Sequence, residues 1–284
     1  MAELLKGKAV AASLNEATRQ TFQSLKDKGI TVTLAVVRVG NREDDLSYEK
    51  GIIRRCEETG VEVNRYILPE DVGIDEFYGL LDRLNKDPDI HGILMFRPLP
   101  KHLGNEKARN SIAPQKDVDG CTDASLAGVF TNKPTGFSPC TAEAAMEILK
   151  YYHIELAGRN VVVLGRSLVV GRPLAMLLMH ENATVTICHT GTLNTPEITR
   201  NSDIIISCIG HAENITAEYV KPGQTVIDVG ITYSETKHKI CGDCLFEEVE
   251  PIVDKITPVP GGVGSVTTAV LIHHVALAAE RHGN

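Results

Sequence analysis

Short apolar stretches alternate with helical stretches through the first third of this chain, and that alternation limits the folds open to it. The segments 31–40, 61–68 and 91–96 are rich in apolar and β-branched residues, which is typical of buried strands. Residues from about 45 to 59 and from about 74 to 86 have helical periodicity and lie between these strands. Strands that alternate with helices of this length predict a mostly parallel sheet with right-handed crossovers.

A second run of the same kind follows a long loop, expected between residues 101 and 140, and a helix near 141–152. The 284 residues are enough for two modest α/β domains, each with its own core. A last helix is expected from about Ser265 to His282. The strands expected in this second run lie at 160–165, 183–189, 202–210 and 224–231.

Composition argues against several classes of protein. A net charge of −8 with no basic stripe argues against nucleic-acid binding. No run approaches the roughly 20 apolar residues that span a bilayer. The first residues mix charged and apolar side chains, which is unlike a secretory signal. The seven cysteines have irregular spacing, which indicates a reducing cytoplasm rather than a disulfide framework.

One cysteine pair, Cys241-Gly-Asp-Cys244, has the spacing of metal ligands or of a redox pair. A structural zinc site would need a second such pair, which the sequence lacks. Redox chemistry would need the pair to open a helix, whereas this pair follows a Lys-rich turn. We therefore expect these cysteines to be incidental and the protein to hold no metal.

A strand followed by a glycine-bounded turn gives the clearest functional signal. Strand 160–165 leads through Arg166 and Ser167 to Gly171, with Pro173 near the first turn of a helix. Glycine lets the backbone approach a pyrophosphate, and the helix N-terminus offers free N–H groups and a positive dipole. The spacing differs from Gly-x-Gly-x-x-Gly, so the flanking strands and helices are what favour a Rossmann phosphate site. A tight turn without a ligand is the alternative.

The next strand favours NADP over NAD. An NAD site usually ends this strand with Asp or Glu, which holds the ribose 2′-hydroxyl. Here the strand ends in Cys188-His-Thr190-Gly-Thr192, without an acid. Arg166 can contact a 2′-phosphate, and the Thr190 hydroxyl offers a further donor. The alternative is that Arg166 is a solvated arginine and that the site is indifferent to the extra phosphate.

Six longer motifs occur in order along nearly the whole chain: Lys116-Asp-Val-Asp119-Gly120, Pro139-Cys-Thr141, Gly165-Arg-Ser-x-x-Val-Gly171-x-Pro173, Ala183-Thr-Val-Thr-x-Cys-His189, Val226-Ile-Asp-Val-Gly-Ile231 and Thr257-Pro-Val-Pro-Gly-Gly-Val-Gly264. Together they resemble the methylenetetrahydrofolate dehydrogenase/cyclohydrolase family. The resemblance implies a two-domain α/β subunit with a Rossmann-type NADP-binding domain, a folate/catalytic domain and an interdomain cleft that holds the active site. It implies a homodimer that acts on tetrahydrofolate one-carbon derivatives.

The resemblance also divides the chain and implies roles for residues. Residues 1–140, completed by a returning helix at 266–284, correspond to the folate domain, and residues 141–265 correspond to the cofactor domain. Tyr48 and Asp119 are the implied catalytic residues: the tyrosine packs against the folate rings, and the aspartate accepts hydrogen bonds from the pterin. Taken alone, Asp119 could instead cap a turn and Tyr48 could be one more half-buried aromatic residue.

The remaining implied site residues fall into two sets. Folate contacts are implied for Phe96, Pro98, Gly262 and Gly264. The dinucleotide site is implied to include Thr141, Gly165, Arg166, Ser167, Thr190, Gly210, Ile231 and Thr267.

The dehydrogenase reaction itself needs few side chains. The nitrogens of the N5–N10 methylene bridge support the cation that forms as hydride leaves, so the protein must mainly hold that carbon against the nicotinamide and exclude water. The sequence accordingly contains no Ser/His/Asp triad and no His-Glu-x-x-His motif at catalytic spacing. The expected activity is oxidation of 5,10-methylenetetrahydrofolate to 5,10-methenyltetrahydrofolate with NADP+, within one-carbon metabolism.

The cyclohydrolase half departs from the family pattern. Relatives use Tyr-x-x-x-Lys, whose spacing puts both groups on one helix face, but Ile52 stands four residues after Tyr48. The glutamine of the family's Gln-Leu-Pro-Leu-Pro segment, which hydrogen-bonds that lysine, is replaced by Phe96. The proline after the Gly-Val-Gly turn is Ser265. A buried glutamine without its lysine would cost about 1–3 kcal/mol, whereas Ile beside Phe is a coherent apolar replacement.

Three hypotheses follow from this pattern. The leading one is a dehydrogenase whose cyclohydrolase activity is weak or absent. The alternative is a fully bifunctional enzyme in which Arg97, Lys50 or a bound water replaces the lost lysine, although Lys50 lies roughly 200° around the helix from Tyr48. The third is a folate-binding or NADP-binding protein without turnover. Retention of Tyr48, Asp119 and the full cofactor set disfavours this last hypothesis.

Overall fold

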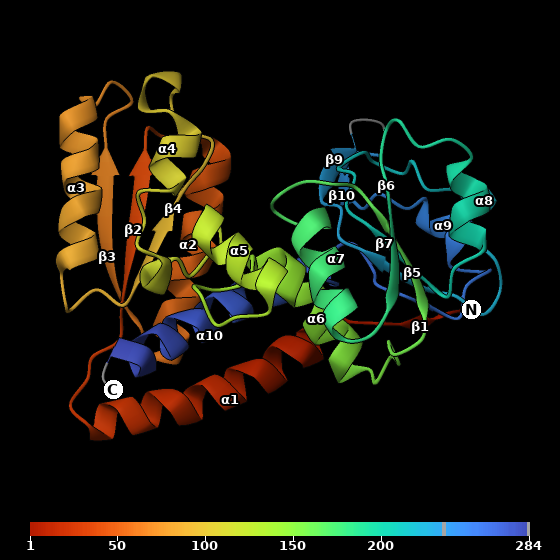
Figure 1. The fold of residues 1–284 in the computed structure, drawn as a ribbon, viewed down its shortest axis with the longest axis horizontal. Coiled ribbons are helices and arrows are strands. Elements are labelled where there is room, and N and C mark those ends of the chain that lie inside the picture. The colour runs from red at the N-terminus through yellow and green to blue at the C-terminus, as the bar shows by residue number, and fades with distance from the viewer. Residues whose placement is uncertain (235–236, 283–284) are drawn as a thin grey trace. The chain divides into compact units, whose positions relative to one another are not determined.

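Two compact units make up the chain, whose computed structural model describes residues 1–234 and 237–282 (Figure 1). The first unit comprises Met1–Ala12 and Thr141–Thr267, and the second comprises Ser13–Cys140 and Thr268–Asn284, of which residues 283–284 lie outside the described part. Each unit is built on a parallel sheet with helices, which confirms the predicted α/β, two-domain fold class. None of the helices in the described residues is long and apolar enough to cross a membrane.

A six-stranded parallel sheet forms the centre of the first unit, in the order β1-β11-β8-β7-β5-β6. The strands β5, β7 and β8 are almost continuous buried apolar runs, as expected inside a parallel sheet. Because β6 pairs with one side of β5 and β7 with the other, the direction of winding reverses at β5. The sheet consists of β1 (Glu3–Leu4), β5 (Asn160–Leu164), β6 (Thr184–Cys188), β7 (Ile204–Ser207), β8 (Thr225–Asp228) and β11 (Lys255–Ile256).

Helices and one hairpin complete the first unit. The antiparallel strands β9 (Thr232–Ser234) and β10 (Lys239–Cys241) form a two-stranded sheet of their own directly after β8. The connecting helices are α6 (Cys140–Tyr151), α7 (Gly171–His180), α8 (Thr195–Arg200), the 3-10 turn η3 (Ala217–Tyr219) and α9 (Phe246–Val249).

The first twelve residues belong to the first unit, whereas the division expected from the sequence grouped them with residues 13–140. Strand β1 pairs in parallel with β11, and the Leu5 N–H donates to the Ile256 carbonyl at 2.9 Å. The Gly7 N–H also donates to the Gly261 carbonyl at 2.8 Å. A two-residue strand carries no periodic pattern, so only the tertiary structure places this segment.

A three-stranded parallel sheet in the order β3-β2-β4 forms the second unit with its helices. Phe77 and Leu81 of α3 are buried in a core with the strand residues Val37 and Ile93. The elements are α1 (Gly7–Asp27), which begins in the first unit, β2 (Thr33–Val39), α2 (Glu43–Thr59), β3 (Glu62–Leu68), α3 (Ile74–Lys86), β4 (Gly92–Met95), η1 (Lys101–Leu103), α4 (Asn105–Arg109), η2 (Pro114–Lys116), α5 (Asp123–Thr131) and α10 (Gly264–His282).

The segment between residues 101 and 140, expected as a loop, contains two helices, α4 and α5. Helix α5 begins after Thr122, whose side chain accepts a hydrogen bond from the Ser125 N–H, and ends at Asn132 in the left-handed conformation. Its apolar side chains do not gather on one face, which is why periodicity does not reveal it. Local capping rather than amphipathicity therefore defines this helix.

A buried ion-pair network fixes α2, the helix that contains Tyr48. The side chains of Glu49 and Arg38 are 2% and 3% exposed, and the Arg38 Nε lies 2.8 Å from the Glu49 Oε2. The Arg65 Nε lies 2.8 Å from the other Glu49 oxygen. Burial alone would raise the pKa of Glu49, but hydrogen bonds from Arg65 and Arg38 outweigh it and lower that pKa.

We predict that Glu49→Gln lowers the free energy of unfolding by about 3 kcal/mol, because it leaves the Arg38 charge buried without its partner. Urea denaturation at pH 7 measures the loss. The pKa of Glu49 is lowered in the folded protein, so its contribution exists above the unfolded pKa of about 4.3 and fades as the pH falls below it. Glu16→Gln, in an exposed pair with Arg19, is the control and should cost under about 1 kcal/mol. Equal losses for both variants would contradict the prediction.

Candidate functional site

The turn between β5 and α7 is too tight for side chains at its two glycines. Gly165 has a φ of +120°, and a Cβ there would lie 2.7 Å from the Cys208 carbonyl oxygen. A Cβ at Gly171 would lie 2.2 Å from the Gly165 carbonyl oxygen. Between them, Arg166 and Ser167 are exposed, and the Ser167 hydroxyl accepts a hydrogen bond from the Val170 N–H at 3.1 Å. The turn therefore offers open backbone at the point where the sheet reverses its winding, the usual ligand position in such sheets.

The loops after β6, β7 and β8 open at the same edge, because carboxyl ends of parallel strands lie together. Thr190, Gly210 and Ile231 stand on these three loops and are exposed, Ile231 by 61%. The turn after β6 contains no acid. Its His189 Nδ1 accepts a hydrogen bond from the Gly191 N–H at 3.1 Å, so this ring is engaged in holding the turn.

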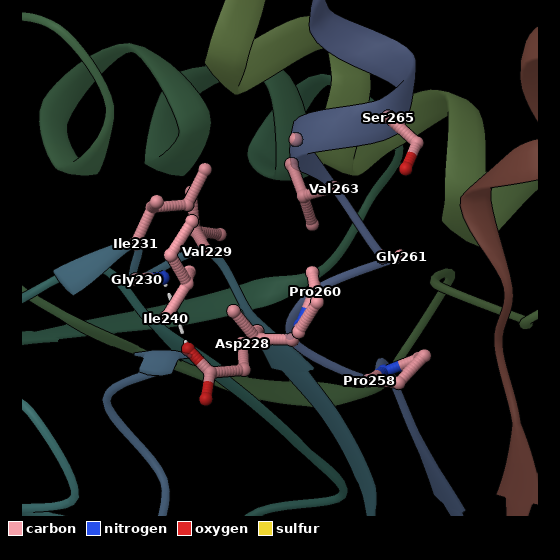
Figure 2. A pocket seen from close by; sticks show the side chains of 13 residues that line it. Asp228, Val229, Gly230, Ile231, Ile240, Pro258, Pro260, Gly261, Val263 and Ser265 are labelled. Atoms are coloured by element: carbon pink, nitrogen blue, oxygen red, sulfur yellow. Dashed lines mark hydrogen bonds between the residues drawn. The ribbon is translucent and has the colours of Figure 1, made fainter. Parts of the chain in front are cut away.

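A pocket of about 190 Å³ lies in the first unit, between the loop after β8 and the Pro258–Ser265 turn. Figure 2 shows Ile231 and Ile240 on one side of it and Val263 and Pro260 on the other. Both predicted glycines of this turn line the pocket, and a Cβ at Gly264 would lie 2.8 Å from the Ile231 Cδ1. The predicted folate residues Gly262 and Gly264 thus belong to the same unit as the predicted dinucleotide residues.

The two predicted threonines are half-buried at the borders of the first unit. Thr141 lies in the first turn of α6, and Thr267 lies in the first turn of α10, where its hydroxyl donates to the Val263 carbonyl at 3.4 Å. The remaining predicted residues, Tyr48, Phe96, Pro98 and Asp119, all belong to the second unit.

Tyr48 and Phe96 form an edge-to-face pair in the second unit. Their ring centroids are 5.7 Å apart with an interplanar angle of 66°. Tyr48 is 41% exposed, whereas Phe96 is 6% exposed and Ile52 only 1%. Burial of the hydroxyl and the nearby charge of Asp119 raise the pKa of Tyr48 well above its usual value, so the phenol stays protonated. The positions that the family fills with lysine and glutamine are apolar and buried here.

Asp119 forms an ion pair with Arg97, which the sequence singled out only as a substitute for the lost lysine. The Arg97 Nη2 lies 3.2 Å from the Asp119 Oδ2, and the two side chains are 26% and 29% exposed. Loss of solvation raises the pKa of Asp119 to about 6. The positive charge of Arg97 opposes that rise, whereas the negative charge of Asp117 adds to it. Arg42 donates a hydrogen bond to the Arg97 carbonyl at 3.3 Å. The carboxyl group is therefore able to exchange a proton close to neutral pH.

Buried polar groups on both sides fix the backbone around Asp119. The Lys116 ammonium, 1% exposed, donates to the Leu84 carbonyl at 2.9 Å, at the end of α3. Asp117, fully buried, accepts a hydrogen bond from the Thr122 N–H at 2.8 Å. The His274 Nδ1 donates to the Val118 carbonyl at 2.9 Å. These groups were not predicted as part of the site, although Lys116 and Asp117 belong to the Lys116-Asp-Val-Asp119-Gly120 motif and His274 to the last helix expected from the sequence.

The cysteine pair shows no sign of redox chemistry. Cys241 and Cys244 are 5% and 2% exposed, and neither forms a disulfide. Burial raises the pKa of both thiols, whereas reactive cysteines need a lowered pKa. Within residues 1–234 and 237–282, no group of three or more His, Cys, Asp or Glu side chains gathers closely enough to hold a metal ion.

Comparison with known proteins decides the family. The chain matches the model of the tetrahydrofolate dehydrogenase/cyclohydrolase catalytic domain over residues 5–119 and that of the NAD(P)-binding domain over residues 139–283. It belongs to the tetrahydrofolate dehydrogenase/cyclohydrolase family. The predicted resemblance is therefore confirmed, and the chain is an enzyme with an NAD(P)-binding domain. Membership speaks against the third hypothesis, a binding protein without turnover.

Individual members of the tetrahydrofolate dehydrogenase/cyclohydrolase family match over almost the full length. A "Bifunctional protein FolD" of Carboxydothermus hydrogenoformans is 53% identical over 281 residues, 99% of this chain and 98% of the relative. The FolD crystal structure from Campylobacter jejuni has a TM-score of 0.95 at 39% identity, with 99% of each chain covered. That of Trypanosoma brucei, complexed with NADP and inhibitor, has a TM-score of 0.91 at 32% identity, with 99% of this chain and 98% of that chain covered. These bifunctional relatives favour the alternative hypothesis over a dehydrogenase alone.

Proposed function

We propose that this enzyme oxidises 5,10-methylenetetrahydrofolate with NADP+ and then hydrolyses the methenyl product. The observation that carries the proposal is that the second unit contains both the Tyr48–Phe96 aromatic pair, with ring centroids 5.7 Å apart, and the Arg97–Asp119 ion pair, with 3.2 Å between Nη2 and Oδ2. An aromatic face beside a carboxylate suits a flat pterin with N–H donors along its edge. Asp119 accepts those hydrogen bonds, and Tyr48 with Phe96 gives the rings an apolar surface. The expected homodimer and cytoplasmic location stay predictions.

The first unit suits a dinucleotide, because Gly165 and Gly171 let the turn after β5 fold back tightly on its own backbone and leave Arg166 and Ser167 exposed. Bound NADP+ would accept the hydride. Arg166 and Ser167 would hold phosphate groups in the turn, with Thr141, Thr190, Gly210, Ile231 and Thr267 around the rest of the dinucleotide. Arg166 and Thr190 are exposed at the edge, and the turn after β6 contains no acid that would repel a 2′-phosphate.

We predict that Arg166→Ala weakens NADP+ much more than NAD+, because only NADP+ has the 2′-phosphate that the guanidinium can bind bidentately. The KM for NADP+ should rise by about tenfold or more, while that for NAD+ changes by less than about threefold. Steady-state kinetics with both cofactors measure the difference. Arg159→Ala, at the opposite end of β5, is the control. Equal catalytic efficiency of the unmutated enzyme with both cofactors would overturn the preference.

Hydrolysis requires proton transfer, and Ile52, at the position of the family's lysine, cannot provide it. Water loses a proton as it adds to the cationic methenyl carbon, and a second proton moves from the new hydroxyl to nitrogen as the ring opens. The guanidinium of Arg97 serves as a fixed positive charge with hydrogen-bond donors only. Asp119, with a pKa of about 6, can take up and return the proton beside it. The Arg97–Asp119 pair is therefore the proposed substitute for lysine and glutamine.

A dehydrogenase without hydrolysis is the second candidate, favoured by one observation. Ile52 is 1% exposed and Phe96 6%, so neither position offers a proton carrier or room for one. A positioned acid or base typically contributes roughly 10²–10⁴-fold to such a step. The choice between the two candidates depends on whether Arg97 and Asp119 restore that factor.

The two candidates separate in one experiment, which mixes purified enzyme, methylenetetrahydrofolate and NADP+ and follows the methenyl absorbance. We expect a transient band, because oxidation and hydrolysis both proceed. Added methenyltetrahydrofolate should decay faster than in an enzyme-free blank. In Arg97→Leu, the excess of the decay rate over the rate in the blank should fall by about tenfold or more, while oxidation continues. Arg54→Leu, a 77% exposed arginine of α2, is the control. A band that persists, with decay at the blank rate, identifies a dehydrogenase alone.

We predict a pH dependence of folate binding from Asp119. Its pKa is raised to about 6, so the ionised acceptor is present above pH 6 and is lost as the pH falls through that value. The KM for methylenetetrahydrofolate should rise by about tenfold per pH unit below pH 6, because the ionised fraction of the carboxyl group falls about tenfold with each unit. Asp119→Asn should show a high KM that is flat from pH 5 to 7. A pH-dependent KM in that variant would show that another group titrates.

A further inference from the structure

Two fully or almost fully buried aspartates lie beneath the loops at the carboxyl edge of the first unit's sheet. Asp228 ends β8 and is 3% exposed. Asp243 lies between Cys241 and Cys244 and is 0% exposed. The segment between these two cysteines contacts the neighbouring loop through the Asp243 carboxylate. Neither carboxylate belongs to the predicted site.

Asp243 holds the loop that follows β7. Its Oδ2 accepts hydrogen bonds from the Ser207 hydroxyl at 2.9 Å and from the Ile209 N–H at 2.8 Å. Its Oδ1 accepts a third from the His211 N–H at 3.1 Å. The two backbone donors stand on either side of Gly210, which is exposed with a φ of +70°. One carboxylate therefore fixes the backbone before and after this glycine.

Asp228 holds the segment that contains Asp243. Its Oδ1 accepts from the Gly230 N–H at 2.9 Å, as Figure 2 shows, and from the Asp243 N–H at 3.0 Å. Its Oδ2 accepts from the Cys244 N–H at 2.8 Å. Asp228, at the end of β8, therefore fixes the backbone of Asp243, and the Asp243 side chain in turn fixes the loop after β7.

Two glycines make this interlock possible. A Cβ at Gly230 would lie 2.3 Å from the Asp243 Oδ1, and a Cβ at Gly242 would lie 2.1 Å from the Asp228 Oδ2. Any side chain at either position would push a carboxylate off its donors. The two aspartates and the two glycines therefore act as one unit.

The loop held in this way lies against the phosphate turn. The Cys208 N–H donates to the Leu164 carbonyl at 2.9 Å, and the Cys208 carbonyl limits the space at Gly165. An ionised carboxylate only accepts hydrogen bonds, so each backbone N–H that binds it must point towards it. An apolar contact would not fix the direction of an N–H group. Burying two carboxylates is costly, and neutral side chains could pack these loops together without that cost.

We propose that Asp243, supported by Asp228, is a positioning residue for the dinucleotide: it sets the Ile209–Gly210–His211 backbone against which the nicotinamide nucleotide binds. This rests on the proposed function of the first unit. Asp243 acts through the loop and does not contact the ligand. Its loss should therefore weaken dinucleotide binding while folate binding, which involves the second unit's Tyr48 and Asp119, stays unchanged.

Asp243→Asn tests the proposal, because the amide keeps the size of the carboxylate but turns one acceptor into a donor facing a donor. NADPH binding to the full chain is titrated by its fluorescence, and steady-state kinetics give the KM for each substrate. We expect the Kd for NADPH and the KM for NADP+ to rise by about tenfold or more, with the KM for methylenetetrahydrofolate within about twofold of the unmutated value. Ser207→Ala, which removes one donor of three, should give a smaller rise of the same kind.

Asp203→Asn is the matched control. Asp203 accepts a hydrogen bond from the Asn160 N–H at 2.8 Å at the amino edge of the same sheet, away from the proposed loop. A fall in Tm shared by both variants, with the rise in Kd confined to Asp243→Asn, supports positioning. An unchanged Kd in Asp243→Asn, or an equal rise in Asp203→Asn, overturns it. If Asp243→Asn does not fold, the NADPH titration of Ser207→Ala decides, and an unchanged Kd there overturns the proposal.

The same measurements separate this inference from the proposed function. An unmutated protein that binds NADPH but does not oxidise methylenetetrahydrofolate overturns the proposed function, and the NADPH titration still decides the role of Asp243. An unmutated protein that oxidises methylenetetrahydrofolate, with an Asp243→Asn variant of equal NADPH affinity, overturns the inference alone.

Discussion

The reversal of winding at β5 is the constraint on which the first unit depends. Because β6 and β7 pair with opposite sides of β5, the loops after β5 and β7 meet at the carboxyl edge, where Gly165 has no space for a side chain beside Cys208. Backbone N–H groups in such loops have no strand partner and must be satisfied locally. Asp228 and Asp243 together accept hydrogen bonds from five backbone N–H groups, of which two follow β7, one follows β8 and two follow β10. Two buried carboxylates thus hold the loops at the carboxyl edge of the sheet in the NAD(P)-binding domain.

In the second unit, the site differs from the family pattern by exchanging buried polar groups for an apolar pair. Ile52 and Phe96 leave nothing unsatisfied, and the new charge stands at the half-exposed Arg97 beside Asp119. Solvent lowers the cost of that charge, while the surrounding protein still raises the pKa of the carboxyl group to about 6. The site therefore keeps a group that titrates near neutrality, although the usual lysine is gone.

Irregular segments near the site are ordered by side chains that bind backbone. Lys116 binds a carbonyl at the end of α3, and Asp117 binds backbone N–H groups that lead into α5. The ion pair between the Arg38 and Glu49 side chains joins β2 to α2. Each of these charges is buried, and each would be costly without its partner. Pairing of buried charges therefore fixes helix α2, which contains Tyr48, and the irregular segment that contains Asp119.

The sequence alone determined the elements with a strong period and the family. The strands near 31–40 and 160–165 and helix α3 were predictable because burial on one or both faces leaves a pattern in consecutive residues. The motifs around Asp119 and Gly165 indicated the family for the same reason, since each is local. Only the tertiary structure decided that β1 joins β11, that Arg97 pairs with Asp119, and that Asp243 reaches the loop after β7. These contacts join residues far apart in the chain, and no local pattern records a partner that folding alone brings near.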